Sequence, residues 1–288
     1  MSLNRRLFVS GLLATSALFV PMSLSEAHAA GLELVFTDLI WHISATGSDV
    51  TGDGSIGAPF QTLQHAYDHA ADTLHLAGGT ITFQLPAGTF VGLATSRRIS
   101  GAGVPADVTV KGVGDSTALT KSFATGCIEL GISAAGIATM LVDSLTVYAP
   151  AGMGLVSYGA GCALEYKNIN FGVCQGHQVQ GAHNTWVAQV GPCKISGSAY
   201  SHMAAETNAV VAPHGGALTI LAAVTFSGAF AYCTAAQLHA AGMTFTNGNL
   251  VSGRRYFVAN FGILGGSNGD PNYFPGTIAG INQNGIYA

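Results

Sequence analysis

The residues best suited to chemistry in this chain are Asp143, Glu165 and Lys167. Asp143 and Lys167 occupy equivalent positions in successive units of a 24-residue repeat in the middle of the chain. If the repeats stack as parallel strands, these two lie about 4.8 Å apart, with Glu165 at a neighbouring position. Two carboxylates and a cation are the minimum set for acid/base chemistry on a sugar, so we predict all three as catalytic residues. The alternative is a surface ion-pair ladder, usually worth under about 1 kcal/mol.

Substrate binding is predicted at Arg254, Arg255 and Trp186. The paired guanidinium groups could hold an anionic sugar through charge-assisted hydrogen bonds, and the indole could stack on a sugar ring. Arg97-Arg98 could act in the same way as Arg254-Arg255. Four tyrosines could also stack on sugars, but they are too scattered in sequence to define a platform: Tyr148, Tyr158, Tyr166 and Tyr200. Ordinary surface and core packing is the alternative for both sets.

No metal site or cofactor is predicted, with calcium as the one alternative. Asp49 and Asp53 flank a glycine-rich loop and could ligate Ca²⁺, but the full EF-hand ligand string is absent. Their carboxylates are more simply explained as acceptors for nearby backbone N–H groups. Four histidines in the middle of the chain follow no zinc-binding spacing and are interpreted as loop residues: His177, His183, His202 and His214.

The five cysteines form no C-x-x-C pair, and their odd number leaves at least one thiol outside any disulfide. We interpret them as small core residues that face inward and stack on one another.

Residues 1–29 have the features of an export signal. Arg5 and Arg6 precede the apolar stretch 7–20, and Ala27-His28-Ala29 provides a cleavage motif. The start also resembles a twin-arginine signal. We predict an exported protein, periplasmic or secreted, with no membrane association after signal removal; an uncleaved anchor is the alternative. Without this segment, Lys plus Arg falls from 10 to 8 and Asp plus Glu from 14 to 13, a balance that disfavours nucleic-acid binding.

The rest of the chain predicts a parallel β-helix with a helix at its N-terminal end. Residues 43–71 indicate a strand, a Gly/Asp-rich loop and an amphipathic helix starting at Pro59, which covers the first coil. Apolar–polar–apolar triplets at 145–147, 169–171 and 193–195 recur at a constant interval, and the pattern continues at 224–226 and 243–245. A β-sandwich is the alternative fold. The predicted divisions are a leader (1–29), strand, loop and capping helix (30–80), coils (81–262) and a Gly/Asn-rich tail or cap (263–288).

A family resemblance rests on both ends of the mature chain. Gly47, Asp49, Gly52-Asp53-Gly54-Ser55, Pro59-Phe60 and Thr62-Leu63 resemble the opening of pectate-lyase-like proteins, and Tyr273–Gly280 resembles endings of phage tailspike-like and prophage proteins. The resemblance implies an all-β, single-stranded right-handed parallel β-helix whose faces bind extended polysaccharide. Active members of the family carry clustered acids, whereas Glu165, Glu206 and Asp270 are the only acids after Asp143.

We therefore predict an exported β-helix protein, structural or carbohydrate-binding and derived from a tailspike, with polysaccharide as its partner. One alternative is a polysaccharide lyase or glycoside hydrolase that acts on an acidic polysaccharide. Another is a self-associating envelope or adhesion protein, for which a homotrimer is the expected assembly.

Overall fold

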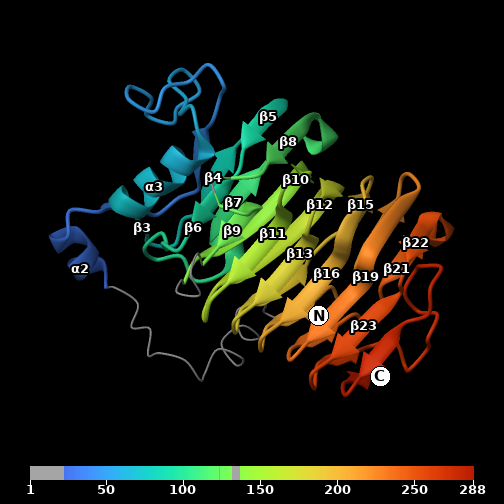
Figure 1. The fold of residues 1–288 in the computed structure, drawn as a ribbon. Helices are drawn as coiled ribbons and strands as arrows, with labels where there is room; N and C mark the ends of the chain where they lie inside the picture. Colours follow the sequence, from blue (N-terminus) through green and yellow to red (C-terminus); the bar gives the residue numbers. More distant parts are fainter. Residues whose placement is uncertain (1–22, 123, 132–136) are drawn as a thin grey trace.

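The computed structural model describes residues 23–122, 124–131 and 137–288, which form a parallel β-solenoid of about eight turns. Figure 1 shows the strands stacked in chain order from the helical end to the C-terminus. The two α-helices of the described part are α2 (Leu24–Ala29) and α3 (Leu63–Thr73). Most of the predicted export signal, residues 1–22, lies outside the described residues. Within them, no helix has the length and apolarity needed to cross a membrane.

Each coil contributes strands to up to three faces, and on each face the strands of successive coils pair in parallel. The first face carries β2 (Leu39–His42), β4 (Ile81–Gln84), β7 (Val108–Lys111), the first parts of β10 (Thr139–Ala149) and β12 (Ala163–Cys174), β14 (Trp186–Gln189), β17 (Val210–Ala212), β20 (Gln237–His239), β24 (Ile263–Gly265) and β26 (Ile286–Tyr287). The second carries β5 (Gly88–Val91), β8 (Thr117–Thr120), the last parts of β10 and β12, β15 (Cys193–Ile195), β18 (Ala217–Ile220) and β21 (Thr244–Thr246).

The third face is a separate sheet. It carries β6 (Leu93–Thr95), β9 (Gly126–Leu130), β11 (Met153–Tyr158), β13 (His177–Ala182), β16 (Ala199–Glu206), β19 (Val224–Thr234), β23 (Tyr256–Ala259) and β25 (Ile281–Gln283), and β22 (Val251–Gly253) pairs with the start of β19. At the N-terminal end, β1 (Glu33–Val35) pairs with β3 (Leu74–Leu76). Short 3-10 segments lie at Pro105–Asp107, Gly114–Ser116 and Gly248–Leu250.

The 24-residue repeat is confirmed for the first three triplets. Leu145 pairs with Ile169, and Asn170 pairs with Lys194. The predicted continuation of the repeat at 224–226 was wrong. The segment that pairs with Cys193–Ile195 is Leu218-Thr219-Ile220, and Val224–Phe226 belongs to the next strand along the chain. Phe245 pairs with Leu218, which shifts the predicted triplet at 243–245 out of register. Coils of unequal length caused both errors.

Left-handed residues turn the chain from the third face back to the first. Asn184, Asn208, Asn260 and Asn284 all have positive φ, a conformation that asparagine tolerates better than most residues. The turns are themselves paired, since the Asn208 N–H donates to the Ala235 carbonyl and the Phe261 N–H to that of Asn284. Backbone bonding therefore continues around these corners.

The interior is a set of buried columns. Phe83, Val110, Val142 and Tyr166 are partners in successive strands, and all are fully buried. The prediction that the cysteines face inward is confirmed, because all five are buried free thiols. Burial raises the pKa of each thiol, that of Cys162 to about 11. These groups therefore behave as small apolar side chains.

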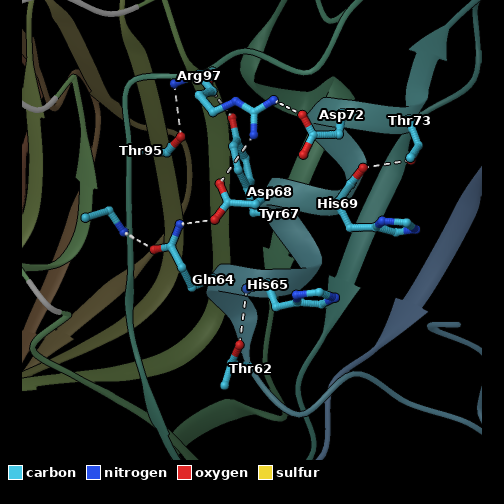
Figure 2. A network of polar contacts seen from close by, with 11 residues as sticks. Thr62, Gln64, His65, Tyr67, Asp68, His69, Asp72, Thr73, Thr95 and Arg97 are labelled. Atoms are coloured by element: carbon cyan, nitrogen blue, oxygen red, sulfur yellow. Dashed lines mark hydrogen bonds and ion pairs between the residues drawn. The ribbon is translucent and has the colours of Figure 1, made fainter. Parts of the chain in front are cut away.

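Helix α3 is confirmed as the N-terminal cap. Its buried residues Leu63, Ala66, Tyr67 and Ala70 face the core. The helix also satisfies the open edge of β6, because the Ala94 N–H donates to Gln64 Oε1. Figure 2 shows the polar contacts that hold the helix, including the Tyr67 hydroxyl on the Arg97 carbonyl (2.8 Å).

Arg97 also stabilises α3, through ion pairs at the protein surface. It pairs with Asp72 and lies 3.9 Å from Asp68 (Figure 2). This use argues against the predicted role of Arg97 in holding an anionic sugar.

The helix begins later than predicted, at Leu63 instead of Pro59. Thr62 is the N-cap and accepts from the His65 N–H, whereas Phe60 is extended. Phe60 forms a parallel bridge with Ile43: its N–H donates to the His42 carbonyl and its carbonyl accepts from Ser44. The backbone around Phe60 is thus used to cover the edge of β2, and it is unavailable to a helix.

Asp49 and Asp53 have the structural role expected of them. Asp49 Oδ1 accepts from the N–H groups of Gln61 and Thr62, and its Oδ2 accepts from the Thr62 hydroxyl (2.6 Å). Asp53 accepts from the Ser55 N–H. Both carboxylates therefore stabilise the loop that leads into α3.

The buried His202 predicts a loss of stability in acid. Its ring lies among Phe171, Phe226 and Phe230, and burial lowers its pKa to about 3. The unfolded chain, with a pKa near 6.5, binds the proton more readily, so stability falls as the pH drops below about 6.5. Between pH 8 and pH 5, the protonation of this one residue lowers the free energy of unfolding by about 2 kcal/mol.

Urea unfolding of wild type and His202→Leu at pH 8 and pH 5 measures this effect. We expect the variant to lose about 2 kcal/mol less than wild type over that interval. Equal losses would show that His202 does not carry the acid sensitivity.

Candidate functional site

The predicted catalytic residues lie together on the outer side of the first face. Asp143 and Lys167 are partners in β10 and β12, with 3.6 Å between Lys167 Nζ and Asp143 Oδ2. Glu165 is half-buried, two positions before Lys167, and pairs with Leu141 and Ala188. The structure thus gives the three residues the proximity expected from the repeat.

Asp143 also has a structural task at the corner between the first and second faces. Its Oδ1 accepts from the Ser144 hydroxyl (2.7 Å) and from the side-chain amide of Asn168 (2.8 Å). Ser144 and Asn168 are the positive-φ residues at which β10 and β12 turn this corner. The carboxylate therefore ties two strained positions together.

The predicted substrate-binding residues do not form one group. Trp186 lies beside the predicted catalytic residues, because it is two positions before Ala188, the partner of Glu165. Arg254 and Arg255 lie between β22 and β23, near the C-terminal end. Arg254 donates to the Ala279 carbonyl, so its guanidinium helps to hold the last coil.

The third face carries a strip of four rings. His177, Tyr200, Tyr232 and Phe257, here called the aromatic strip, come from β13, β16, β19 and β23. Ring centroids are 5.4 Å apart for His177 and Tyr200, 6.0 Å for Tyr200 and Tyr232, 5.9 Å for His177 and Tyr232, and 5.0 Å for Tyr232 and Phe257. Tyr200 is exposed, and Tyr232 and Phe257 are half-buried. His177, Tyr200 and Tyr232 therefore form a triangle of rings, Phe257 stacks on Tyr232, and the group is open to solvent at Tyr200.

Gly228 makes room for this strip. A Cβ on Gly228 would lie 2.5 Å from Tyr200 Cζ. The Tyr200 ring thus rests on the bare backbone of the following coil.

A polar network runs beside the aromatic strip. The Tyr158 hydroxyl donates to Gln180 Oε1 (2.9 Å), and Gln180 Nε2 donates to Glu206 Oε2 (2.7 Å). His177 Nε2 lies 4.0 Å from the other oxygen of Glu206, and His177 Nδ1 bonds to the buried Ser201 hydroxyl at 2.6 Å. These side chains fix the orientation of the His177 ring.

Burial sets the protonation of two network members. It lowers the pKa of His177 to about 4, so the imidazole is neutral at pH 7. Burial, with the charges of Glu129 and Glu206, raises the pKa of Tyr158 to about 12. Tyr158 is therefore a hydrogen-bond donor at neutral pH. The neighbours of Glu206 in the network, Gln180 and His177, are both neutral at that pH.

A pocket of about 430 Å³ opens at the end of the strip that carries Tyr200 and His177. Its lining also includes Lys121, Thr125, Ala151, Gly152, Met153, Gln175 and Gly176. Its volume lies within the range of small-ligand sites. A wider hollow of about 870 Å³ lies on the first face beside the loop that precedes α3, and it is lined by residues such as His42, Gln84 and Val113.

The interpretation of the histidines as loop residues was wrong for two of the four. His177 and His202 lie in strands β13 and β16, whereas His183 and His214 lie in turns. His214 stacks on His239, with centroids 5.7 Å apart. In the part of the chain that the structure describes, no three His, Cys, Asp or Glu side chains are arranged to hold a metal ion.

The aromatic strip was not predicted from the sequence. Tyr200 was a candidate for stacking, but Tyr232 and Phe257 were not, and Tyr166 is fully buried in the core. The interval from Ala204 to its partner Tyr232 is longer than that from Gln180 to its partner Ala204, so the 24-residue period does not bring Tyr232 beside Tyr200.

Comparisons with known protein families, with curated proteins and with solved structures found no match.

The corner role of Asp143 can be separated from its ion pair by mutation. We expect Asp143→Ala to lower the free energy of unfolding by about 1–3 kcal/mol, because it leaves the Ser144 and Asn168 donors without their acceptor. Lys167→Met should cost under about 1 kcal/mol, since Lys167 is over one-third exposed. Urea denaturation measures both, and equal costs would contradict the corner role.

Proposed function

We propose that this chain is an exported β-solenoid that binds an extended polysaccharide along its third face. The observation that carries the proposal is the aromatic strip, His177, Tyr200, Tyr232 and Phe257, with ring centroids 5.0–6.0 Å apart. Aromatic rings offer a flat apolar surface with polar edges, which suits the alternating C–H and hydroxyl groups of a sugar. Adjoining rings on a rigid sheet can contact more than one sugar unit at once.

The polar network supports the same function. Tyr158, Gln180 and Glu206 lie beside the rings and provide hydroxyl, amide and carboxylate groups. Such groups fix the orientation of a ligand that the apolar surface holds. Because the network members already bond to one another, they lose little rotamer freedom when a sugar binds.

Export and a relationship to the pectate-lyase-like and tailspike-like proteins belong to this proposal. The export signal in residues 1–29 and the Gly/Asp-rich opening support them. A self-associating envelope protein, with a homotrimer as its assembly, is the alternative that solution size measurements would test.

A polysaccharide lyase or glycoside hydrolase is the second candidate. The proximity of Asp143, Glu165 and Lys167 on the first face favours it, as does Glu206 beside the aromatic strip. Glu165 or Glu206 could serve as a general acid or base for a sugar bound next to it.

Variants of the strip test the binding function. On glycans that bind wild type in an array, we expect Tyr200→Ala and Tyr232→Ala each to weaken binding by about 10-fold, because each removes one stacked ring. Gly228→Ala should weaken binding as well, because its Cβ displaces the Tyr200 ring.

Gly57→Ala is the matched control, since a Cβ there contacts nothing within 4 Å. Isothermal titration with a captured glycan gives the affinities, and circular dichroism confirms folding. Unchanged affinity in both tyrosine variants would overturn the proposal.

A turnover assay on the bound glycans tests the second candidate. If the chain depolymerises its ligand, we expect Glu165→Gln to abolish the release of oligosaccharides, because the amide cannot transfer the proton. Glu206→Gln, on the third face, is the comparison variant. If oligosaccharide release survives in Glu165→Gln and is lost in Glu206→Gln, the site at Glu165 is contradicted. The reaction would then be assigned to the third face.

A further inference from the structure

The pocket beside Tyr200 and His177 contains a positively charged side chain in addition to the two rings. Among the described residues of its lining, Lys121 alone is charged at neutral pH, because none of them is Asp or Glu and His177 is neutral. Among the described residues, no ion pair involves Lys121. An unpaired ammonium group in a concave site is a binding group for an anion.

Lys121 is exposed, and its aliphatic stem lies over Gly152. A Cβ on Gly152 would lie 2.9 Å from Lys121 Cδ and 2.4 Å from the Thr125 carbonyl oxygen, so the lysine stem lies across bare backbone. Gln175, also in the lining, adds an amide. The lining of the pocket therefore combines a cation and an amide with the Tyr200 ring.

Two carboxylates that contact residues of the lining are already engaged. Glu129 is 5% exposed, and its Oε2 accepts from the N–H groups of Thr125 and Gly126 and from the Thr125 hydroxyl. Glu206 lies beyond His177 and accepts from Gln180. Neither is part of the pocket lining.

We propose that this pocket is an anion subsite, in which Lys121 and Gln175 bind the carboxylate or sulfate group of an acidic sugar whose ring stacks on Tyr200. The inference rests on the proposed polysaccharide-binding function and names its ligand class. The sugar that enters the pocket is a charged unit, and neighbouring units of the chain contact Tyr232 and Phe257.

The test compares charged and neutral forms of one sugar. Isothermal titration uses oligogalacturonides, their methyl esters and a sulfated galactan oligosaccharide, with wild type, Lys121→Met and Lys111→Met. Lys111 is an exposed lysine on the first face and serves as the matched control. Circular dichroism confirms that the variants fold.

We expect wild type and Lys111→Met to bind at least one acidic probe about 10-fold more tightly than a neutral one, and Lys121→Met to lose that preference. Added salt should weaken acidic binding less in Lys121→Met than in wild type. Preference for the uronate or for the sulfated probe identifies the anion.

Two outcomes would overturn the subsite alone: equal binding of acidic and neutral probes by wild type, or an unchanged preference in Lys121→Met. Both leave the aromatic strip and its tyrosine variants unaffected. If wild type binds neither these probes nor any arrayed glycan, the polysaccharide-binding function itself fails, and the subsite fails with it.

Discussion

Each coil of this solenoid hydrogen-bonds through its backbone to the next, and the remaining features depend on that parallel pairing. Because side chains alternate across a strand, pairing in register turns every outward position into a column that runs along the axis. The same rule buries Phe83, Val110, Val142 and Tyr166 in one inward column. A chain with only 8% charged residues can form such a fold because backbone bonds, rather than ion pairs, connect its layers.

Continuous pairing makes the corners and the ends the places where polar side chains are needed. Asp143 bonds to Ser144 and Asn168 at one corner, and asparagines with positive φ form another. At the N-terminal end, Gln64 satisfies the free edge of β6, where an open strand would otherwise invite pairing with another chain. Polar side chains are thus used where the continuous backbone pairing turns a corner or ends.

The sequence predicts those parts of the molecule that repeat at a constant interval. The triplets at 145–147, 169–171 and 193–195, the helix with Leu63 and Tyr67 buried, and the proximity of Asp143 and Lys167 all follow from local spacing. Prediction fails towards the C-terminus, because the interval from Ala204 to its partner Tyr232 differs from that between Tyr232 and its partner Phe257. The rings of the aromatic strip depend on these unequal intervals, so no fixed period brings them together.

The contrast between the first and third faces bears on where function resides. On the first face, Asp143 has a structural reason to be present, since without it two left-handed corners lose an acceptor. On the third face, no comparable demand of the fold explains why Tyr200 is exposed over Gly228 or why Tyr232 and Phe257 stack outside the core. Exposed aromatic side chains cost solvation free energy that polar residues would avoid. Their presence as a group on a rigid sheet is therefore better explained by a ligand than by folding, and the third face is the stronger candidate for function.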